Sequence, residues 1–216
     1  LGVPERFFFD GCSPGVAEGV RAALDELAAA GARLVPFELP EAEAAFELWR
    51  NGHLSAPEAY TTLRTTALSA WVDTLDPNVW TRMSTYGEMS AAEYIERRRR
   101  VLGWMEGVNR RVAAEVDAFV APTIPITAPT LDEVATLDGY RERNVAASRN
   151  AAVLSLFDLC AVTLPVALDA AGIPVGMQVA TARGREARLL GMALAMERRL
   201  GTARERLGRP PLVPAD

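Results

Sequence analysis

Two strand-like runs joined by a short turn place the tightest limit on the fold of this chain. Residues 161–164 form a short apolar run that Pro165 ends, and residues 175–180 form a second run. Between them, residues 169–172 read Asp-Ala-Ala-Gly, which is typical of a turn. A connection this short joins antiparallel strands, because parallel strands need a crossover of about a dozen residues or more. The sequence therefore predicts a hairpin and a sheet that is not purely parallel.

The rest of the chain alternates between helical and strand patterns. Ser90, followed three residues later by Glu93, marks the start of the longest helix. The apolar spacing predicts helices over residues 14–30, 41–50, 56–74, 91–116, 141–157 and 185–200, and further strands over 6–10, 33–39 and 118–121. The proline-rich end, residues 210–214, is expected to be extended. This alternation, together with the hairpin, predicts an α/β fold with a mixed sheet, and the length allows a single domain over residues 1–216.

The basic residues exclude several chemistries. All 23 are arginine, so the chain contains no lysine, and its formal charge is −5. P-loop, Schiff-base and Ser–Lys chemistry each require a lysine. One histidine and two cysteines are too few for a typical structural zinc site, so no metal and no cofactor is expected. We also expect no nucleic-acid partner, no membrane span and, from the sparse cysteines, a cytoplasmic location.

A possible nucleophile motif occurs near the start of the chain. Residues 11–15 read Gly-Cys-Ser-Pro-Gly, a literal G-x-S-x-G between a predicted strand and a predicted helix. A hydrolase of that class needs a histidine late in the fold, whereas the one histidine, His53, follows only 40 residues later. We therefore interpret Ser13 as a helix N-cap with Pro14 at the first helical position.

Four other features have both structural and functional interpretations. The run Arg97–Arg100 points in four directions around a helix, which favours a solvated face, and His53 follows a turn signal and is interpreted as a surface residue. Cys160 precedes a strand and is interpreted as an inert core thiol. Asp158 lies in the same apolar run, where a buried carboxylate must be paired; it either caps a turn or faces a pocket.

Several segments resemble the motifs of amidase signature enzymes, in the same order and at matching spacing. The longest is DAFVAPTIPITAP at residues 117–129, which fits the pattern D-x-x-x-x-P-T-x-P-x-x-A-P. The shorter matching segments are LGVP at 1–4, GARLV at 31–35, RN at 149–150, LCAVTLP at 159–165, GIPVGMQ at 172–178 and EARLL at 186–190. The resemblance covers nearly the whole chain. It implies the C-terminal part of an α/β/α sandwich with a mixed sheet.

The resemblance also implies what this part would contribute. Such enzymes hydrolyse amides with a Ser–cis-Ser–Lys triad whose nucleophile lies in a Gly/Ser-rich loop. The chain has no lysine, and none of its seven serines has Gly/Ser-rich flanks, so we expect no catalytic residue here. By resemblance, Thr123, Ile124, Asp158 and Cys160 belong to the substrate-binding wall, and Arg82 is either a holder of a substrate carboxylate or an ordinary helix arginine. The Leu-Cys-Ala sequence after Asp158 is also similar to allophanate hydrolases.

These observations lead to one prediction and one alternative. The chain is expected to be the C-terminal half of an amidase that is inactive alone and binds a small amide substrate only with the N-terminal half. Because it begins with leucine, we expect the lysine and the serine loop upstream of Leu1. Exposure of the missing interface predicts self-association, such as a homodimer. The alternative is a non-catalytic pseudo-amidase or protein-interaction module.

Overall fold

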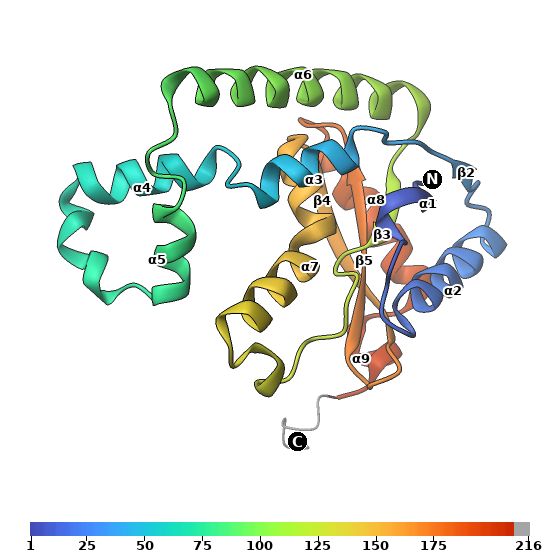
Figure 1. Ribbon diagram of the computed structural model, residues 1–216. Helices are drawn as coiled ribbons and strands as arrows, with labels where there is room; N and C mark the ends of the chain where they lie inside the picture. The colour runs from blue at the N-terminus through green and yellow to red at the C-terminus, as the bar shows by residue number, and fades with distance from the viewer. Residues whose placement is uncertain (210–216) are drawn as a thin grey trace.

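The computed structural model describes residues 1–209, in which a mixed sheet forms the centre (Figure 1). Its strands, in the spatial order β2-β1-β3-β5-β4, are β1 (Gly2–Val3), β2 (Val35–Pro36), β3 (Phe119–Pro122), β4 (Cys160–Leu168) and β5 (Pro174–Thr181). β1 is parallel to β2 and β3, whereas β5 is antiparallel to β3 and β4. The predicted hairpin and the mixed sheet are confirmed. The predicted extended segment 210–214 lies outside the described residues.

The predicted helices are present with small differences in their bounds. They are α2 (Val16–Ala29), α3 (Ala42–Arg50), α4 (Ser55–Thr65), α6 (Ala91–Glu115), α7 (Leu137–Leu156) and α8 (Glu186–Leu200). As predicted, Ser90 caps α6, and its hydroxyl accepts a hydrogen bond from the Glu93 N–H at 3.1 Å. The stretch predicted as one helix over 56–74 divides at Thr66 into α4 and the 3₁₀ helix η1 (Ala67–Thr74). Four short helices were not predicted: α1 (Glu5–Phe8), α5 (Pro77–Ser84), the 3₁₀ helix η2 (Asp132–Val134) and α9 (Ala203–Leu207).

The predicted strand over residues 6–10 is wrong. The chain turns there through α1, and Phe7 has a left-handed φ of 74°. A half-buried strand exposes every second side chain, but Phe7, Phe8 and Phe9 are all buried. Apolarity marked these residues as interior without specifying their conformation. The strand in this part of the chain is the short β1, which precedes these residues and lies between β2 and β3.

Helices cover both faces of the sheet. In Figure 1 the sheet stands between α7 on one side and α2 and α8 on the other. α2 and α8 contact β4 and β5, while α3 and α6 pack against α7. The core between these layers includes fully buried aromatic side chains such as Phe8, Phe119 and Phe157. Burial of this apolar surface is the main stabilising contribution to the fold.

A small helical lobe, here residues 55–86, projects to one side of this body. It consists of α4, η1 and α5, which pack mainly against one another (Figure 1). Leu68 and Trp71 in η1 are exposed, at 49% and 64%. No helix within residues 1–209 is long and apolar enough to span a bilayer.

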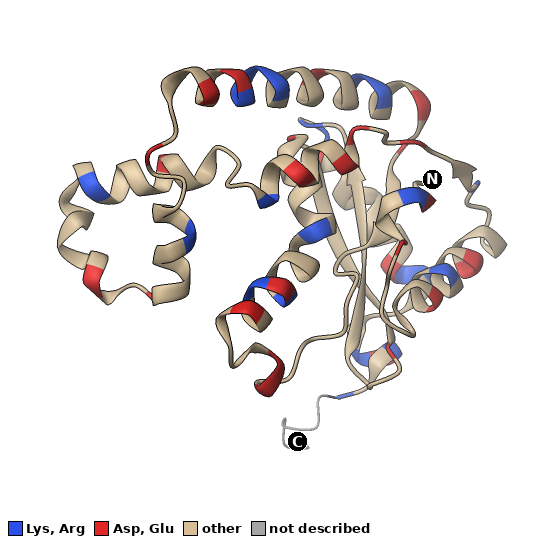
Figure 2. Ribbon diagram, viewed as in Figure 1, with Lys and Arg blue, Asp and Glu red and all other residues tan. Residues whose placement is uncertain are grey.

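The charged helix α6 runs across one end of the molecule. Segments of basic and of acidic residues follow one another along its ribbon in Figure 2. Arg98, Arg99 and Arg100 are exposed, which confirms the solvated face predicted for them. Arg97 differs, because its side chain is only 17% exposed and pairs with Glu93 at 2.7 Å.

Candidate active site

A cavity of about 440 Å³ opens at the end of β3, beside the hairpin of β4 and β5. Thr123 and Ile124, both predicted site residues, line it from the loop that follows β3. The hairpin supplies the opposite wall, which consists of Thr163, Pro165, Asp169, Ile173, Pro174, Val175 and Gly176. Val16 of α2 and Ala147 of α7 also line the cavity. The cavity is therefore mostly apolar with a few hydroxyl groups, as is typical of small-molecule sites.

Two threonine hydroxyls meet in the lining of the cavity. The Oγ1 atoms of Thr123 and Thr163 lie 3.2 Å apart, and the Thr123 N–H donates to the Gly176 carbonyl at 2.8 Å. Gly176 makes this meeting possible, because a Cβ there would lie 2.7 Å from Thr163 Cγ2 and 2.9 Å from Thr123 Oγ1. The missing side chain leaves space for the hydroxyl pair.

The proline-rich loop after β3 is held in place by Ser13, which lies 114 residues before Thr127 of this loop. Ser13 donates its N–H to the Pro125 carbonyl at 2.9 Å, and its Oγ accepts from the Thr127 N–H at 3.0 Å. The interpretation of Ser13 as an N-cap is therefore wrong: α2 begins at Val16 with Gly15 as its N-cap. The Ser13 hydroxyl is used to dock the loop that carries Thr123 and Ile124.

Asp169 fixes the hairpin turn and the same loop together. Its Oδ2 accepts from the Thr127 hydroxyl at 2.6 Å, and its Oδ1 accepts from the N–H groups of Ala171 and Ile173, both at 2.9 Å. Burial, the largest influence, favours the neutral acid, but these hydrogen bonds outweigh it and lower the pKa of Asp169. Asp169 is thus an ionised anchor of the cavity wall.

Asn150 of α7 holds the point where β3 becomes the loop. Its side chain is fully buried, and its Nδ2 donates to the carbonyls of Phe8 at 2.9 Å and Pro122 at 2.8 Å. The buried Gln178 donates to the same Pro122 carbonyl at 3.2 Å. Both residues lie within the family motifs at 149–150 and 172–178, and no role was predicted for either. An amide in an apolar helix stretch was the available signal, because a buried amide must be hydrogen-bonded.

Cys12, which precedes Ser13 in the same motif, is not an activated nucleophile. Burial, the largest influence, raises the pKa of the Cys12 thiol, despite the nearby Arg149 guanidinium. A raised pKa keeps the thiol protonated, whereas the thiolate is the reactive form. Among residues 1–209, no group of three or more His, Cys, Asp or Glu side chains is placed to hold a metal ion.

The family model that describes amidases matches residues 1–190. The chain belongs to the amidase family. It is 39% identical over 220 residues to the 2-amino-5-chloromuconic acid deaminase of Comamonas testosteroni, covering 98% of this chain and 46% of that protein. It is 33% identical to an amidase of Pseudomonas putida over 59% of this chain and 26% of that protein. The chain thus spans less than half the length of these relatives.

Solved amidase-family structures share the fold of this chain. An allophanate hydrolase of Kluyveromyces lactis superimposes with a TM-score of 0.76 at 20% identity, covering 96% of this chain and 34% of that one. A 6-aminohexanoate cyclic dimer hydrolase superimposes with a TM-score of 0.72 at 20% identity, covering 98% of this chain and 46% of that one. The predicted α/β class with a mixed sheet is therefore confirmed as the amidase fold.

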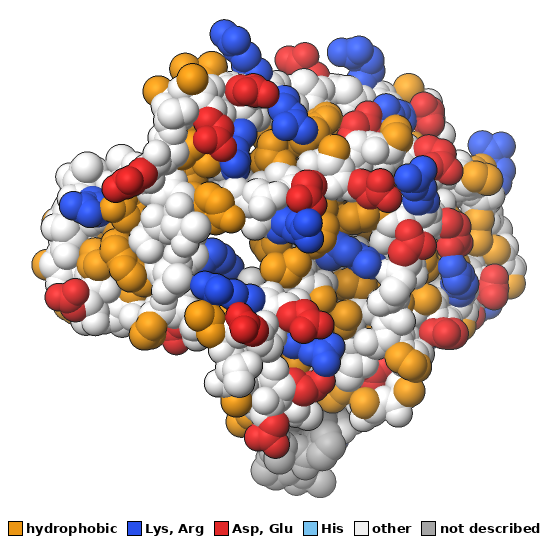
Figure 3. Space-filling view, in the orientation of Figure 1, with side chains coloured by type: hydrophobic (Ala, Val, Ile, Leu, Met, Phe, Trp, Pro, Cys, Tyr) orange, Lys and Arg blue, Asp and Glu red, His pale blue; other side chains and the backbone are white. Residues whose placement is uncertain are grey.

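Arg82 lies at a second cavity, of about 290 Å³, between the lobe and the body. From the lobe side, Arg82, Met83 and Tyr86 line it, and from the body side Trp49, Arg50, Asn144 and Val145 do so. Figure 3 shows arginine side chains gathered in the space between the lobe and the rest of this face. The α7 helix borders both cavities, through Ala147 at the first and through Asn144 and Val145 at the second.

The remaining two predicted site residues lie apart from both cavities. Asp158 is exposed at the end of α7 with a φ of 54°, and it pairs with Arg183 at 3.3 Å. The expectation of a buried carboxylate is therefore wrong, and a turn after the helix explains its position. Cys160 is half-buried at the start of β4, where its Sγ lies 3.1 Å from the Ala182 carbonyl. The structure brings Thr123 and Ile124 together and leaves Arg82, Asp158 and Cys160 outside their cavity.

Proposed function

We propose that this chain supplies the substrate-binding part of an amidase that hydrolyses a C–N bond. The 440 Å³ cavity carries the proposal, because the family motif at residues 117–129 leads directly into its wall. Thr123 and Ile124 would contact the acyl group or substituent of the substrate. The loop anchors at Ser13, Asn150 and Asp169 would keep that wall in place while the substrate binds.

The catalytic groups would come from sequence outside these 216 residues. The chain has no lysine, and the one serine whose flanks resemble a nucleophile motif, Ser13, is engaged in docking the loop. In the proposed complete enzyme, a second serine bound to the lysine takes the proton of the nucleophilic serine, which attacks the carbonyl carbon. The amine or ammonia then leaves, and water hydrolyses the acyl-enzyme. Residues 1–216 would form part of one domain with that catalytic segment.

We further propose that Arg82 binds a carboxylate of the substrate. Arg82 lines the second cavity, and a guanidinium binds carboxylates through two parallel hydrogen bonds. The name of the Comamonas relative, at 39% identity, also describes an amino-substituted acid. Asp158 and Cys160 would be close to the substrate only if the catalytic segment extends the site past β4. We therefore propose that Asp158 and Cys160 support the part of the complete site that lies beside β4.

A chimera tests this function directly. In the Comamonas deaminase, this chain would replace the segment that corresponds to residues 1–216. Hydrolysis of the relative's own acid substrate would be measured as the release of ammonia. We expect turnover, and Arg82→Met should raise KM about 10–100-fold, since a charge-assisted hydrogen bond contributes roughly 1.5–3 kcal/mol. A folded chimera without turnover would contradict the proposal.

The matched control is a second arginine of the same lobe. Arg64 lies on α4 and stacks over the Tyr60 ring at 5.4 Å, away from the cavity lining. Arg64→Met should leave KM for the acid unchanged. An equal rise in KM for both variants would show a general effect of charge and would remove the assigned role of Arg82.

The alternative, a non-catalytic module that associates with itself or a partner, has one observation in its favour. Leu68 and Trp71 are exposed in η1, three residues apart, which is one turn of a 3₁₀ helix. We expect the isolated chain to self-associate, and light scattering should show a mass above 23.3 kDa. Trp71→Ser should reduce that mass if η1 takes part, whereas a clean monomer for the unmodified chain would contradict the expectation.

A further inference from the structure

The lobe joins the body through a turn that contains the single histidine of the chain. His53 lies between α3 and α4 with a left-handed φ of 47°, next to Gly52 with a φ of 90°. Two left-handed residues in succession are rare outside glycine and asparagine. Gly52 is required here, since a Cβ would lie 2.4 Å from the Tyr86 ring at the other end of the lobe. Both ends of the lobe therefore meet at this turn.

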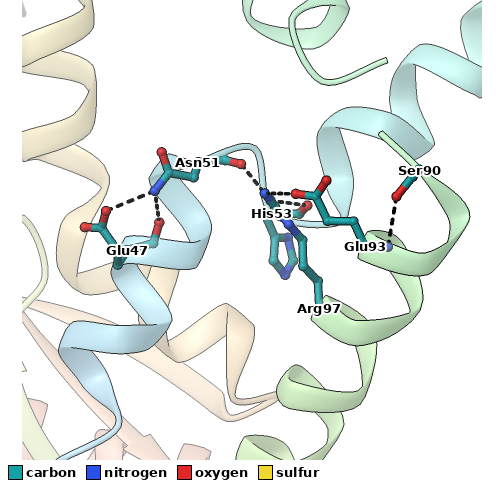
Figure 4. Close-up of polar contacts among 6 residues, drawn as sticks. All are labelled: Glu47, Asn51, His53, Ser90, Glu93 and Arg97. Carbon is teal, nitrogen blue, oxygen red and sulfur yellow. Dashed lines mark hydrogen bonds and ion pairs between the residues drawn. The ribbon is translucent and has the colours of Figure 1, made fainter. Parts of the chain in front are cut away.

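Arg97 of α6 braces the same turn. Its Nη1 donates to the Asn51 carbonyl at 2.7 Å and to the His53 carbonyl at 3.4 Å, while its Nη2 binds Glu93 at 2.7 Å (Figure 4). Asn51 is itself tied to the end of α3, because its Nδ2 donates to Glu47. Figure 4 shows the His53 imidazole beside the Arg97 side chain. One guanidinium thus connects α6 with the pivot of the lobe.

The imidazole of His53 lacks a partner at its inner nitrogen. Its Nε2 is buried and has no hydrogen bond, which is true of no other buried side-chain nitrogen or oxygen in residues 1–209. A neutral ring tolerates this position at modest cost. A protonated ring would place a buried N–H and a positive charge there without an acceptor, which is far more costly.

The charged groups around His53 act in opposite directions. Burial is the largest influence and lowers the pKa of His53, Glu58 of α4 raises it, and Arg97 lowers it. Glu58 already accepts a hydrogen bond from Tyr94 of α6, and Glu93 is paired with Arg97. The nearby carboxylates are therefore engaged, and a second cation would face the Arg97 guanidinium.

We propose that His53 is a pH-sensitive pivot whose protonation releases the helical lobe from α6. The docked lobe requires the neutral imidazole, and the released lobe lets water reach the ring. Since Arg82, Met83 and Tyr86 face the second cavity from the lobe side, release would remove one wall of that cavity. The consequence for substrate binding rests on the proposed role of Arg82, whereas the pivot does not.

The sign of the pH dependence follows from the lowered pKa. Docking is fully stabilised above the ordinary histidine pKa of 6.5, where both states are neutral. As the pH falls below 6.5, the released state binds a proton first and gains population, by up to about tenfold per pH unit until the docked-state pKa is reached. The lobe should therefore open under mildly acidic conditions.

Two measurements on the 216-residue chain test the pivot without any catalytic readout. Because there is one histidine, a single imidazole signal in NMR reports its pKa, which we expect below 6.5. Hydrogen–deuterium exchange over residues 55–86, corrected for the intrinsic rate, should accelerate by up to about fivefold as the pH falls from 6.5 by one unit. Exchange in β5 should keep its rate over the same range.

His53→Asn is the matched variant, because asparagine tolerates left-handed backbone and does not titrate. The lobe of this variant should exchange at a rate independent of pH over the same range. An imidazole pKa at or above 6.5, an unchanged lobe exchange rate, or the same acceleration in His53→Asn would each overturn the proposal. An inactive chimera would contradict only the proposed function, so the two failures are distinguishable.

Discussion

Replacing Asn150 by alanine should destabilise the fold and release the loop that carries Thr123 and Ile124. Asn150 is fully buried, and its Nδ2 donates two hydrogen bonds of 2.9 and 2.8 Å to the Phe8 and Pro122 carbonyls. The variant would lose both donors at the junction of α7, β3 and the turn around Phe8. The effect should therefore be larger than that of an exposed helix substitution.

The expected magnitude follows from these contacts. Each hydrogen bond contributes about 1 kcal/mol net, and a buried carbonyl left without a donor adds about 1 kcal/mol or more. The Pro122 carbonyl keeps its bond from Gln178, whereas the Phe8 carbonyl keeps only a weak contact from the Cys12 thiol at 3.9 Å and is the main group left without a strong donor. The free energy of unfolding should fall by about 3 kcal/mol. Asn150→Asp should be worse at neutral pH, because a carboxylate cannot donate to two carbonyls.

Urea unfolding followed by circular dichroism measures this loss. With a slope of about 2 kcal/mol per molar urea, the midpoint should fall by roughly 1.5 M at constant chain concentration. Ser155→Ala is the control, since Ser155 is exposed on the same helix and bonds only its own Ala151 carbonyl. Its effect should stay within about 0.5 kcal/mol. Equal midpoints for the two variants would refute the anchoring role of Asn150.

Two further predictions concern the cavity wall. Gly176→Ala should lower the free energy of unfolding by about 1–3 kcal/mol, because the new Cβ would push Thr123 and Thr163 apart. Adding Thr163→Ser should recover part of this loss, because it removes the crowded Cγ2. Urea midpoints of the single and double variants measure both effects, and the absence of any recovery would contradict the prediction. Because the pKa of Asp169 is lowered, its carboxylate stabilises the hairpin turn at pH values above 3.8, and this stabilisation is lost as the pH falls below 3.8. Hydrogen exchange of the Ala171 and Ile173 amides should therefore accelerate below pH 3.8 in the unmodified chain and not in Asp169→Asn.

The sequence predicted those parts of the fold in which local pattern and tertiary packing agree. The hairpin at 169–172, the Ser90 cap and the long α6 all have local signals that the structure confirms. The run Phe7–Phe9 was wrongly predicted to be a strand, because a fully buried strand and a fully buried turn have the same apolar composition. Ser13 misled for a related reason: the partner of its hydroxyl, the Thr127 N–H, is 114 residues away.

The candidate site was predictable only where the family motif reaches it. Thr123 and Ile124 lie on the motif and line the cavity, whereas Asp158 was expected to be buried and is exposed beside Arg183. The anchors Asn150 and Asp169 were missed because their partners come from several distant segments. His53 was interpreted as a surface residue, yet its Nε2 is buried. Such contacts depend on the assembled fold and have no periodic signature in the sequence.

The most direct test of the proposed function is the rate of amide hydrolysis by the purified 216-residue chain alone. This sequence contains no lysine, and the Asp169 carboxylate that lines its cavity is occupied by hydrogen bonds from Thr127, Ala171 and Ile173. Simple aryl and alkyl amides should therefore remain at their uncatalysed rate, while the chimera with the catalytic segment of the Comamonas relative turns over. Hydrolysis by the lysine-free chain itself would contradict the proposal that its catalytic groups lie elsewhere.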